Sequence, residues 1–540
     1  VLLDVDASVF ETLFAEQYRG KERLLESNVR ALHLGRDYVR EHLAAPIGLR
    51  VERRDHVGEQ IFVDGNSAIA LGLVYGGATV AAWYPITPST SIAEAFQKYC
   101  SKYRVDAASG RQNFAIVQAE DELAAIGVVV GAGWNGARAF TATSGPGISL
   151  MTEFIGLAYF AEIPVTIIDV QRGGPSTGMP TRTQQSDLIS TAYASHGDTK
   201  HVLLFPQDPH ECFEHAAAAL DLADRLQTPI FVMTDLDIGM NQRLCRPFQW
   251  DEQRDYDRGK VMSAAELDAG REFARYKDVD GDGIPWRTLP GTHPTKGSYF
   301  TRGTTRDPYA RYSERGPDYL YNMDRLRRKF KTAATLVPQP VERAAKQKTP
   351  WGVIYFGSTS PAMAEALDVL EARGIAVDAM RLRAFPFPDS VPKFIAAHDK
   401  VFVGHAAGDR LSVIDTSTLA VTPRTIMGAS IWALAGDPSF GLVAGGRLGQ
   451  DNNRGLLLSI DPQTGLEKKR LEESPSKSVA RAKSQSPGVP GTGLPLRQLV
   501  LGEDLAQADR NVLVLRRVIE YAFAMEGMTL GLIQSLAMPG

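Results

Sequence analysis

The sequence YPITPSTS at residues 84–91 determines how the rest of the chain is interpreted. It follows an apolar run at residues 79–83 that is typical of a buried strand. Pro85 and Pro88 disfavour both a continued helix and sheet pairing, so a rigid extended loop is predicted. A polar loop at the carboxyl end of a buried strand is where open α/β sheets place their ligands.

A second polar stretch, QAEDE at residues 118–122, has the same layout. A short β-branched run at residues 114–117 precedes it, and a helix is predicted to follow. In the first stretch, Thr90 or Ser91 is suited to cap the next helix, predicted over residues 92–99. Both stretches are therefore expected where a strand gives way to a helix.

Short apolar strands alternate with helices between residues 50 and 234. The predicted strands are 114–117, 139–143, 165–170, 201–205 and 230–234, and the intervening helices include 121–132, 147–162 and 209–225. This alternation predicts a doubly wound α/β domain with a parallel sheet. Glycine- and proline-rich loops at 145–147 and 173–175 are then expected on the same rim as Thr87 and Glu120.

A second α/β segment is predicted after residue 349. A strand at 353–356 leads through Gly-Ser-Thr-Ser at 357–360 into a helix at 361–373, and strands at 377–382 and 401–403 follow. Composition and periodicity divide the chain into segments 1–48 (helical), 49–241 (first α/β domain), 242–348 (irregular), 349–404 (second α/β domain), 405–470 (β-rich), 471–500 (linker) and 501–540 (C-terminal helix).

The composition is that of a soluble globular protein. The chain has 540 residues, 44% hydrophobic and 23% charged, with a net charge of −4 and no basic block, which argues against a nucleic-acid surface. The cysteines lie too far apart for a disulfide framework or an iron–sulfur cluster: Cys100, Cys212 and Cys245. No signal peptide is recognised at the start, and we expect a cytoplasmic protein.

A membrane span is the alternative for residues 68–86, nineteen residues without a charge. Gly76, Gly77 and Pro85 argue against it. A helix over 67–75, a turn and a buried strand explain the stretch better, so no membrane contact is predicted.

The motifs together resemble one family. AWYPITPS at 82–89 with QAE at 118–120, TSGPG at 143–147 and QRGGPSTG at 171–178 is similar to the α subunit of 2-oxoacid:ferredoxin oxidoreductases, most like the 2-oxoglutarate branch, also called 2-oxoglutarate synthase. The likeness runs from about residue 10 to about residue 403. It implies a pyrimidine-binding domain of the thiamine-enzyme type, followed by a transketolase C-terminal-like α/β domain; the irregular tail that follows lies outside the resemblance. Residues 1–48 then resemble the end of a γ domain fused ahead of the α part.

The resemblance implies an enzyme subunit with shared cofactors. Such enzymes decarboxylate a 2-oxoacid oxidatively with coenzyme A as co-substrate and reduce ferredoxin; for 2-oxoglutarate the product is succinyl-CoA, and the reverse reaction fixes CO2, as in the reductive TCA cycle. Thiamine diphosphate would lie between this chain and a β subunit that holds magnesium and a [4Fe-4S] cluster. A dimer of αβ pairs is the implied assembly. Pyruvate or a branched-chain 2-oxoacid stays open as the substrate.

Glu120 matches the family's acid that hydrogen-bonds the cofactor's aminopyrimidine, the implied catalytic role. Burial would raise the pKa of such an acid, and Ala119, Leu123 and Ala124 are expected to supply apolar surroundings. The plain alternative is an acid placed for the helix dipole.

Four further residues match substrate- or cofactor-binding positions, each with a plain alternative. Thr87 matches a residue at the reacting carbon, with Pro85 beside it; otherwise its hydroxyl bonds its own loop. Arg172 matches the arginine that binds the substrate carboxylate, or is a salt-bridged surface arginine. Ser144 could bind an anion, cap a helix, or both. His196 could reach a second substrate carboxylate, or be structural.

An aspartate-rich loop at residues 278–283 matches the start of a calcium-binding loop, but its twelfth position is Leu289 rather than glutamate. Gly281, Asp282 and Gly283 also mimic the motif that anchors the diphosphate of thiamine enzymes. The asparagine that this motif requires is missing between residues 303 and 312. A simple turn is the favoured interpretation, and no metal site is predicted on this chain.

The tail after residue 404 departs from the family. Residues 411–418 and 457–465 both run through β-branched residues to an aspartate-led turn, and their aspartates are 46 residues apart, near a propeller-blade period. Two units cannot close a propeller.

Two other functions stay open for the chain. One is an inactive α-like scaffold subunit, and the other is a propeller-like binding module in the tail.

Overall fold

The computed structural model describes residues 1–3, 5–46, 51 and 56–398 in full, and after residue 399 the backbone of strands up to residue 473. The chain forms two compact units, Val1–Gln60 and Ile61–Gly540. The first holds the helices α1 (Ala7–Gln17) and α2 (Glu22–His42), which confirms the predicted helical segment. Asp6 caps α1 by accepting a hydrogen bond from the Ser8 N–H, and His33 of α2 bonds Glu11 of α1 at 2.6 Å.

The second unit is built on a seven-stranded sheet in the order β12-β6-β7-β5-β4-β2-β3. Its strands are β2 (Val80–Trp83), β3 (Ala115–Gln118), β4 (Ala139–Thr143), β5 (Val165–Gln171), β6 (Val202–Leu204), β7 (Pro229–Asp235) and the edge strand β12 (Ala384–Phe385). All pairs are parallel except β12 with β6. The doubly wound parallel sheet predicted from the alternation is confirmed.

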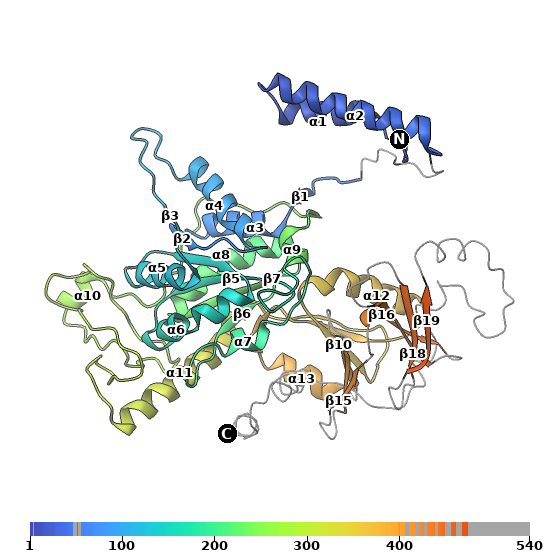
Figure 1. Cartoon of the computed structure of the whole chain (residues 1–540). Coiled ribbons are helices and arrows are strands. Elements are labelled where there is room, and N and C mark those ends of the chain that lie inside the picture. The colour runs from blue at the N-terminus through green and yellow to red at the C-terminus, as the bar shows by residue number, and fades with distance from the viewer. Residues whose placement is uncertain are drawn as a thin grey trace. The chain divides into compact units, whose positions relative to one another are not determined.

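Helices cover both faces of this sheet (Figure 1), namely α3 (Gly65–Tyr75), α4 (Thr90–Tyr103) and α8 (Pro209–Leu226) on one side, with α5 (Glu122–Trp134) and α6 (Gly145–Ala161) on the other. Alternate strand residues enter the two cores: Ile167 packs with α5 and α6, and Ile168 with the other set. The chain runs from β2 out to β3 and then back across to β4. Strand β2, between β3 and β4, is therefore the switch point where such sheets bind ligands.

The start of α4 differs from the prediction. The helix begins at Thr90 after Ser89, and neither Thr90 nor Ser91 caps it. The Thr90 hydroxyl instead bonds Ile86, accepting from its N–H at 3.0 Å and donating to its carbonyl at 3.2 Å. The hydroxyl is used to close the preceding loop, so it does not cap the helix.

The uncharged stretch 68–86 forms α3, a turn and β2, as predicted. Asp64 caps α3 by accepting from the Ser67 N–H at 2.7 Å. No helix in the described part of the chain is both long and apolar enough to cross a membrane.

Residues 242–348 contain more structure than predicted. Strand β8 (Arg243–Cys245) pairs with β1 (Ile61–Val63), α10 (Ala264–Asp268) carries a capping box, and α11 (Gly316–Leu336) is a helix of 21 residues, followed by β9 (Val341–Arg343). The helix α11 was missed because several residues on its buried side are polar or charged, including Asn322, Arg325 and Lys329. Arg325 and Lys329 pair with Glu162, which follows the last residue of α6, and no local pattern reveals this contact.

The aspartate-rich loop is held by protein cations. Lys260 donates to Asp282 and pairs with Asp280, at 2.9 and 2.6 Å, and Arg328 donates to Asp278 at 3.1 Å. Asp278 also accepts from the N–H groups of Gly281 and Gly283. The loop is therefore a turn whose carboxylates are compensated by side chains.

A second sheet follows in the order β15-β14-β13-β10-β11-β9. It contains β10 (Trp351–Tyr355), β11 (Asp378–Arg381) and β13 (Lys400–Gly404), with the one-turn helix η1 (Gly357–Thr359), α12 (Ser360–Ala372) and α13 (Ser390–Ala397). These match the predicted strands and helix. Arg381 ties this sheet to the first by two hydrogen bonds of 2.8 Å to Glu211 of α8.

The tail contains the predicted strands, but they do not repeat one unit. Strand β14 (Arg410–Asp415) pairs with β13 and with β15 (Val421–Thr425), whereas β18 (Gly455–Ile460) lies in a separate antiparallel sheet with β16 (Ala429–Asp437), β17 (Gly441–Leu448) and β19 (Glu467–Glu473). The two similar stretches therefore occupy different sheets and are not equivalent blades. The predicted linker beyond residue 473 and the C-terminal helix at 501–540 lie outside the described residues.

Candidate functional site

Four of the predicted site residues follow neighbouring strands of the parallel sheet. The loops after β2, β3, β4 and β5 carry Thr87, Glu120, Ser144 and Arg172, and these strands stand side by side in the order β5-β4-β2-β3. Parallel strands end at one edge of a sheet, so the four residues share one rim, as the sequence predicted. We call this edge the site rim.

Arg172 joins two loops of the site rim. Its buried guanidinium donates through Nη1 to the Thr87 carbonyl at 2.6 Å and through Nη2 to the Ser176 carbonyl at 3.2 Å. Its Nε is buried without a protein partner. Both acceptors are neutral, and among the described residues Arg172 forms no salt bridge, the alternative considered for it; its charge acts at longer range on Asp187.

The loop with Thr87 is shaped by buried contacts that sequence reasoning missed. Thr87 and Pro85 are exposed, whereas Pro88 and Ser89 are buried. Asn66, fully buried in the first turn of α3, donates to the Pro88 carbonyl at 2.8 Å and to the Ser91 hydroxyl at 2.9 Å. A polar residue inside an apolar helix was the available signal for it. Asn66 holds the back of the loop, so Thr87 faces outward.

The three acids after β3 have three different surroundings. Asp121 caps α5 by accepting from the Ala124 N–H at 2.7 Å, and Glu122 is buried. Glu120 is exposed at the site rim. The expected burial of Glu120 is therefore not provided by this chain, because Leu123 and Ala124 also lie at the surface.

The surface that continues from Glu120 over β3 and α5 carries little charge, whereas on α6 the exposed Glu153 lies at helical spacing between Leu150 and Leu157. Helix α5 carries one charged residue, Glu122, which is buried, and strand β3 carries none. Large apolar side chains on these elements and on α6 are 38–55% exposed: Val117, Leu123, Val128, Leu150 and Leu157. We call this surface the α5–α6 face. Contiguous exposed apolar surface of this kind marks an interaction site.

A distant acid lies at the amino end of α6. Ser144 occupies the cap position, but its hydroxyl makes no capping bond and is buried without a protein partner. The carboxylate of Asp187 lies beside Gly145, the first residue of α6, and the Gly145 N–H helps to lower its pKa. A Cβ at Gly145 would lie 2.6 Å from both Asp187 carboxylate oxygens, so glycine is required for this approach. The helix-cap alternative for Ser144 is therefore not what the structure shows.

A second buried acid lies near Asp187. Asp169 of strand β5 is fully buried, and neither of its carboxylate oxygens has a hydrogen-bond partner in the protein. Burial, with a smaller contribution from Asp187, raises the pKa of Asp169 well above its usual value. Burial likewise raises the pKa of Asp187 to about 6, although Ser186, Arg172 and the Gly145 N–H oppose it. A lone aspartate in a mostly apolar strand was the sequence signal for this pair.

The pKa of Asp187 predicts a pH-dependent stability. Because its pKa rises from 3.8 to about 6 on folding, the native state binds more protons than the unfolded chain between these values. This contribution to stability is therefore present below pH 4 and is lost as the pH rises through 6. We expect the thermal midpoint of wild type minus that of Asp187→Asn to decrease as the pH is raised from 4 to 7.

The control for this measurement is Asp198→Asn, which changes an exposed carboxylate eleven residues further on. Its midpoint difference from wild type is expected to stay nearly constant over the same range. A constant difference for Asp187→Asn as well would mean that Asp187 does not take up a proton on folding in this range.

His196 does not lie on the site rim. Its side chain is 89% exposed, and its Nε2 lies 3.9 Å from Glu153. Glu153 is eight residues into α6, about 12 Å along the helix from the end that faces the site. The prediction that His196 contacts a substrate carboxylate therefore has no support within this chain.

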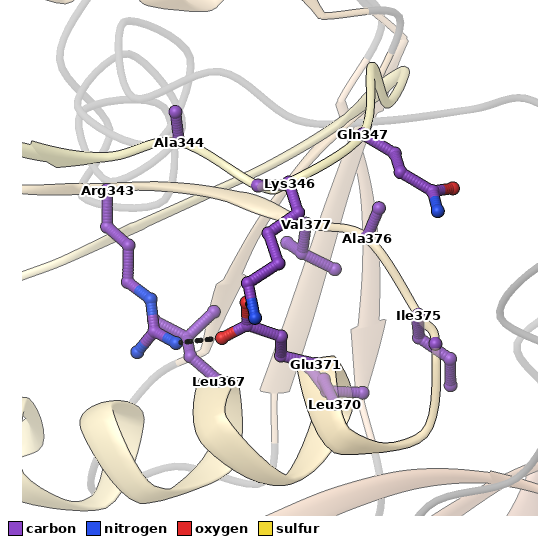
Figure 2. A pocket seen from close by; sticks show the side chains of 12 residues that line it. Arg343, Ala344, Lys346, Gln347, Leu367, Leu370, Glu371, Ile375, Ala376 and Val377 are labelled. Atoms are coloured by element: carbon purple, nitrogen blue, oxygen red, sulfur yellow. Dashed lines mark hydrogen bonds and ion pairs between the residues drawn. The ribbon is translucent and has the colours of Figure 1, made fainter.

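A small cavity of about 120 Å³ lies elsewhere, between β9 and α12. Figure 2 shows Arg343 and Lys346 pointing toward Glu371, with apolar lining from Leu367, Leu370 and Ile375. Both cations pair with Glu371, at 2.9 and 2.8 Å, and Arg343 also pairs with Asp368. Their charges are compensated, so we assign no ligand to this cavity.

The chain is similar in sequence to a known domain family and to known proteins. Residues 72–266 match the domain described as pyruvate flavodoxin/ferredoxin oxidoreductase, thiamine diphosphate-binding. Subunit alpha of 2-oxoacid:ferredoxin oxidoreductase 2 from Aeropyrum pernix is 34% identical over 399 residues, covering 72% of this chain and 60% of that one. The 2-oxoglutarate synthase subunit KorA from Methanothermobacter thermautotrophicus is 43% identical over 190 residues, or 35% of this chain and 48% of the relative.

A solved structure is similar over most of the fold. The 2-oxoglutarate:ferredoxin oxidoreductase from Magnetococcus marinus, with 2-oxoglutarate, coenzyme A and succinyl-CoA bound, has a TM-score of 0.62 at 27% identity. The match covers 75% of this chain and 68% of that one. The chain thus spans about half to three fifths of the length of the curated relatives described here.

Proposed function

We propose, from the premise that residues 72–266 carry the thiamine diphosphate-binding domain of the pyruvate flavodoxin/ferredoxin oxidoreductase family, that this chain is the α subunit of a 2-oxoacid:ferredoxin oxidoreductase. The observation that carries the proposal is the site rim, where Glu120, Thr87, Ser144 and Arg172 follow four adjacent parallel strands. The complete reaction is the CoA-dependent oxidative decarboxylation of a 2-oxoacid with reduction of ferredoxin.

The residues on the site rim suit the pyrimidine end of thiamine diphosphate. Glu120 offers a carboxyl group that can hydrogen-bond a ring nitrogen, and the largely apolar α5–α6 face begins beside it. When bound, the cofactor supplies the nucleophilic carbon and the electron sink that decarboxylation requires. In the described part of the chain, no cluster of three or more acidic, histidine or cysteine side chains could hold a metal ion. Magnesium, the diphosphate and a [4Fe-4S] cluster are assigned to a β subunit.

The β subunit is proposed to cover the α5–α6 face. Covering this face would bury Glu120 against apolar surface, and burial raises the pKa of a carboxyl group toward the range useful for proton transfer. The exposure of Glu120 in the single chain and the exposed apolar side chains of the α5–α6 face support this arrangement. A second αβ pair, ferredoxin as electron acceptor and a cytoplasmic location complete the proposed assembly.

Arg172 is proposed to bind the carboxylate of the 2-oxoacid. Its guanidinium is fixed by two carbonyl oxygens and has no salt-bridge partner among the described residues, and a planar guanidinium pairs well with a carboxylate. Thr87, on the loop that Arg172 holds, is then placed near the reacting carbon, with Pro85 beside the cofactor. The buried, unpartnered hydroxyl of Ser144 is available to donate to the same ligand.

2-Oxoglutarate is the proposed substrate. The identities to 2-oxoglutarate synthase subunits and the fold of the Magnetococcus marinus enzyme support this choice over pyruvate or a branched-chain 2-oxoacid. The test mixes the chain with a β subunit of this family and measures 2-oxoacid- and CoA-dependent reduction of a one-electron dye. We expect turnover with 2-oxoglutarate at a higher kcat/KM than with pyruvate or 2-oxoisovalerate.

The outcomes of this test differ in meaning. Faster turnover of pyruvate would keep the enzyme class and refute the substrate. A stable complex without turnover of any 2-oxoacid would refute the enzyme and favour an inactive scaffold subunit.

A further inference from the structure

The segment at residues 172–187 links the site rim to other parts of the second unit, and we call it the arginine loop. It starts at Arg172, which holds the Thr87 loop, and ends at Asp187, which lies at the amino end of α6. Within it, the Gly173 N–H bonds the Arg182 carbonyl at 2.8 Å, and the Met179 N–H bonds the Gly173 carbonyl at 3.0 Å. Most residues between 174 and 182 are exposed. Its conformation therefore depends on the contacts of its two ends.

The carboxyl end of the arginine loop is fastened to the second sheet through Gln185. The Gln185 amide donates to the Asp235 carboxylate at 2.8 Å and contacts the Ser358 hydroxyl at 3.1 Å, and Ser358 also donates to Asp235. Ser358 belongs to η1, which follows β10, whereas Asp235 ends β7 of the first sheet. Three segments far apart in sequence meet at one buried carboxylate.

The backbone of the second sheet is shaped for this contact. Gly357 has φ +59°, and a Cβ there would lie 2.9 Å from the Gln185 amide nitrogen. Asp235 is fully buried, and its other oxygen accepts from the Ile238 N–H at 2.9 Å, at the start of α9 (Leu236–Met240). The acceptor is thus rigid, and a hydrogen bond to a charged acceptor is stronger than one between neutral groups.

We propose that Ser358 and Asp235 are positioning residues, which hold Gln185 and thereby keep the arginine loop in the conformation that presents Arg172 to its ligand. The inference deepens the proposed function and rests on it for the ligand, a 2-oxoacid carboxylate. The second α/β segment then contributes to substrate binding without touching the substrate. An unfastened loop would have to be ordered when substrate binds, which weakens binding.

The first test measures amide hydrogen exchange in the full chain, with no partner or substrate. In Ser358→Ala the loss of a hydroxyl bonded to a buried carboxylate is expected to raise the exchange rate of residues 173–182 about 10-fold. The matched control is Ser360→Ala, two residues away, because the Ser360 hydroxyl is buried without a protein partner. Equal exchange in the two variants would refute the tether.

The second test measures kinetics of the same variants in complex with a β subunit. Ser358→Ala is expected to raise the KM for the 2-oxoacid about 10-fold and to change kcat less than about 2-fold, because only loop ordering is added to binding. A general loss of structure would also change the KM for coenzyme A and lower the thermal midpoint, so both quantities are measured as controls. Faster exchange with an unchanged 2-oxoacid KM would refute the positioning role.

A third variant adds a pH signature. Gln185→Glu keeps the size of the side chain but places a second carboxyl group against Asp235, whose pKa is raised by burial. At low pH one of the two acids is protonated and can bond the other; at high pH both ionise and repel. We expect the exchange rate of the arginine loop to increase with pH in Gln185→Glu beyond the change in wild type. A parallel pH profile would contradict the contact.

The hydrogen-exchange and kinetic experiments test this inference and the proposed function separately. If no 2-oxoacid is turned over by the wild-type complex, the proposed function fails, while the exchange measurements still confirm or refute the tether.

Discussion

Replacing Glu120 with glutamine is expected to lower kcat of the complex with a β subunit by about 10²–10⁴-fold. An amide can still accept or donate a hydrogen bond at the pyrimidine nitrogen, but it cannot exchange a proton with it. Glu120 makes no contact that stabilises the chain and is exposed, so folding and assembly are expected to persist. The measurement is 2-oxoacid-dependent dye reduction at saturating cofactor, with complex formation checked by size-exclusion chromatography.

The neighbouring acid provides the matched control. Asp121→Asn also removes one carboxylate, but Asp121 acts as the cap of α5, and asparagine caps a helix as well as aspartate does. Its kcat is expected to stay within about 3-fold of wild type, since a cap substitution of this kind changes helix stability little. Retention of more than a tenth of wild-type kcat by Glu120→Gln would exclude Glu120 as the essential acid.

Glu162→Gln is expected to have the largest effect on stability, a loss of about 3–5 kcal/mol, because it leaves buried cations unpaired. Glu162 ends α6 at φ +58°, and its side chain is fully buried. It pairs with Arg325, with Lys329 at 2.8 Å and with Arg306 at 3.3 Å. Two of these cations lie on α11 and the third precedes it, so the substitution also weakens the attachment of α11.

The comparison is with Glu153→Gln on the same helix, whose carboxylate is 79% exposed. That variant is expected to differ from wild type by less than about 0.5 kcal/mol. Denaturation by urea, followed by tryptophan fluorescence, measures both. Similar midpoints for the two variants would mean that the charges around Glu162 are hydrated after the substitution.

The same network predicts sensitivity to acid. Burial alone would raise the pKa of Glu162, but Arg325 and Lys329 outweigh it and hold the pKa well below its usual range. A carboxyl group with a lowered native pKa contributes stability above its unfolded pKa, and this contribution is lost as the pH falls toward the native pKa. The stability difference between wild type and Glu162→Gln should therefore narrow below about pH 4.

The amino-acid sequence by itself determined the framework of the first α/β domain. The period of its apolar runs placed β4 at residues 139–143 and located the other strands of the parallel sheet to within a few residues. The same pattern put Thr87, Glu120, Ser144 and Arg172 at strand ends. Since the ends of parallel strands share one edge of a sheet, their common rim followed from topology without any coordinates.

Other features depended on pairs that are distant in sequence. Arg325 meets Glu162 across 163 residues, and Gln185 meets Ser358 across 173 residues. No local sequence pattern reveals either pair, and residues 242–348, which contain α11, were predicted to be irregular. His196 is the opposite case: its place beside Glu153, away from the site rim, depends on how its loop packs along α6.

Burial likewise had to come from the tertiary structure. Asp169 and Asp187 are both acids in sequence, and only the tertiary packing around β5, α6 and α7 (Leu188–Ala192) makes one fully buried and brings the other to the amino end of α6. Glu120, expected to be buried, is exposed because β3 and α5 beside it pack on the core with one face and leave the other face open to solvent. Local sequence sets the backbone period through short-range sterics and apolar spacing, whereas solvation of a given side chain depends on which distant segment covers it.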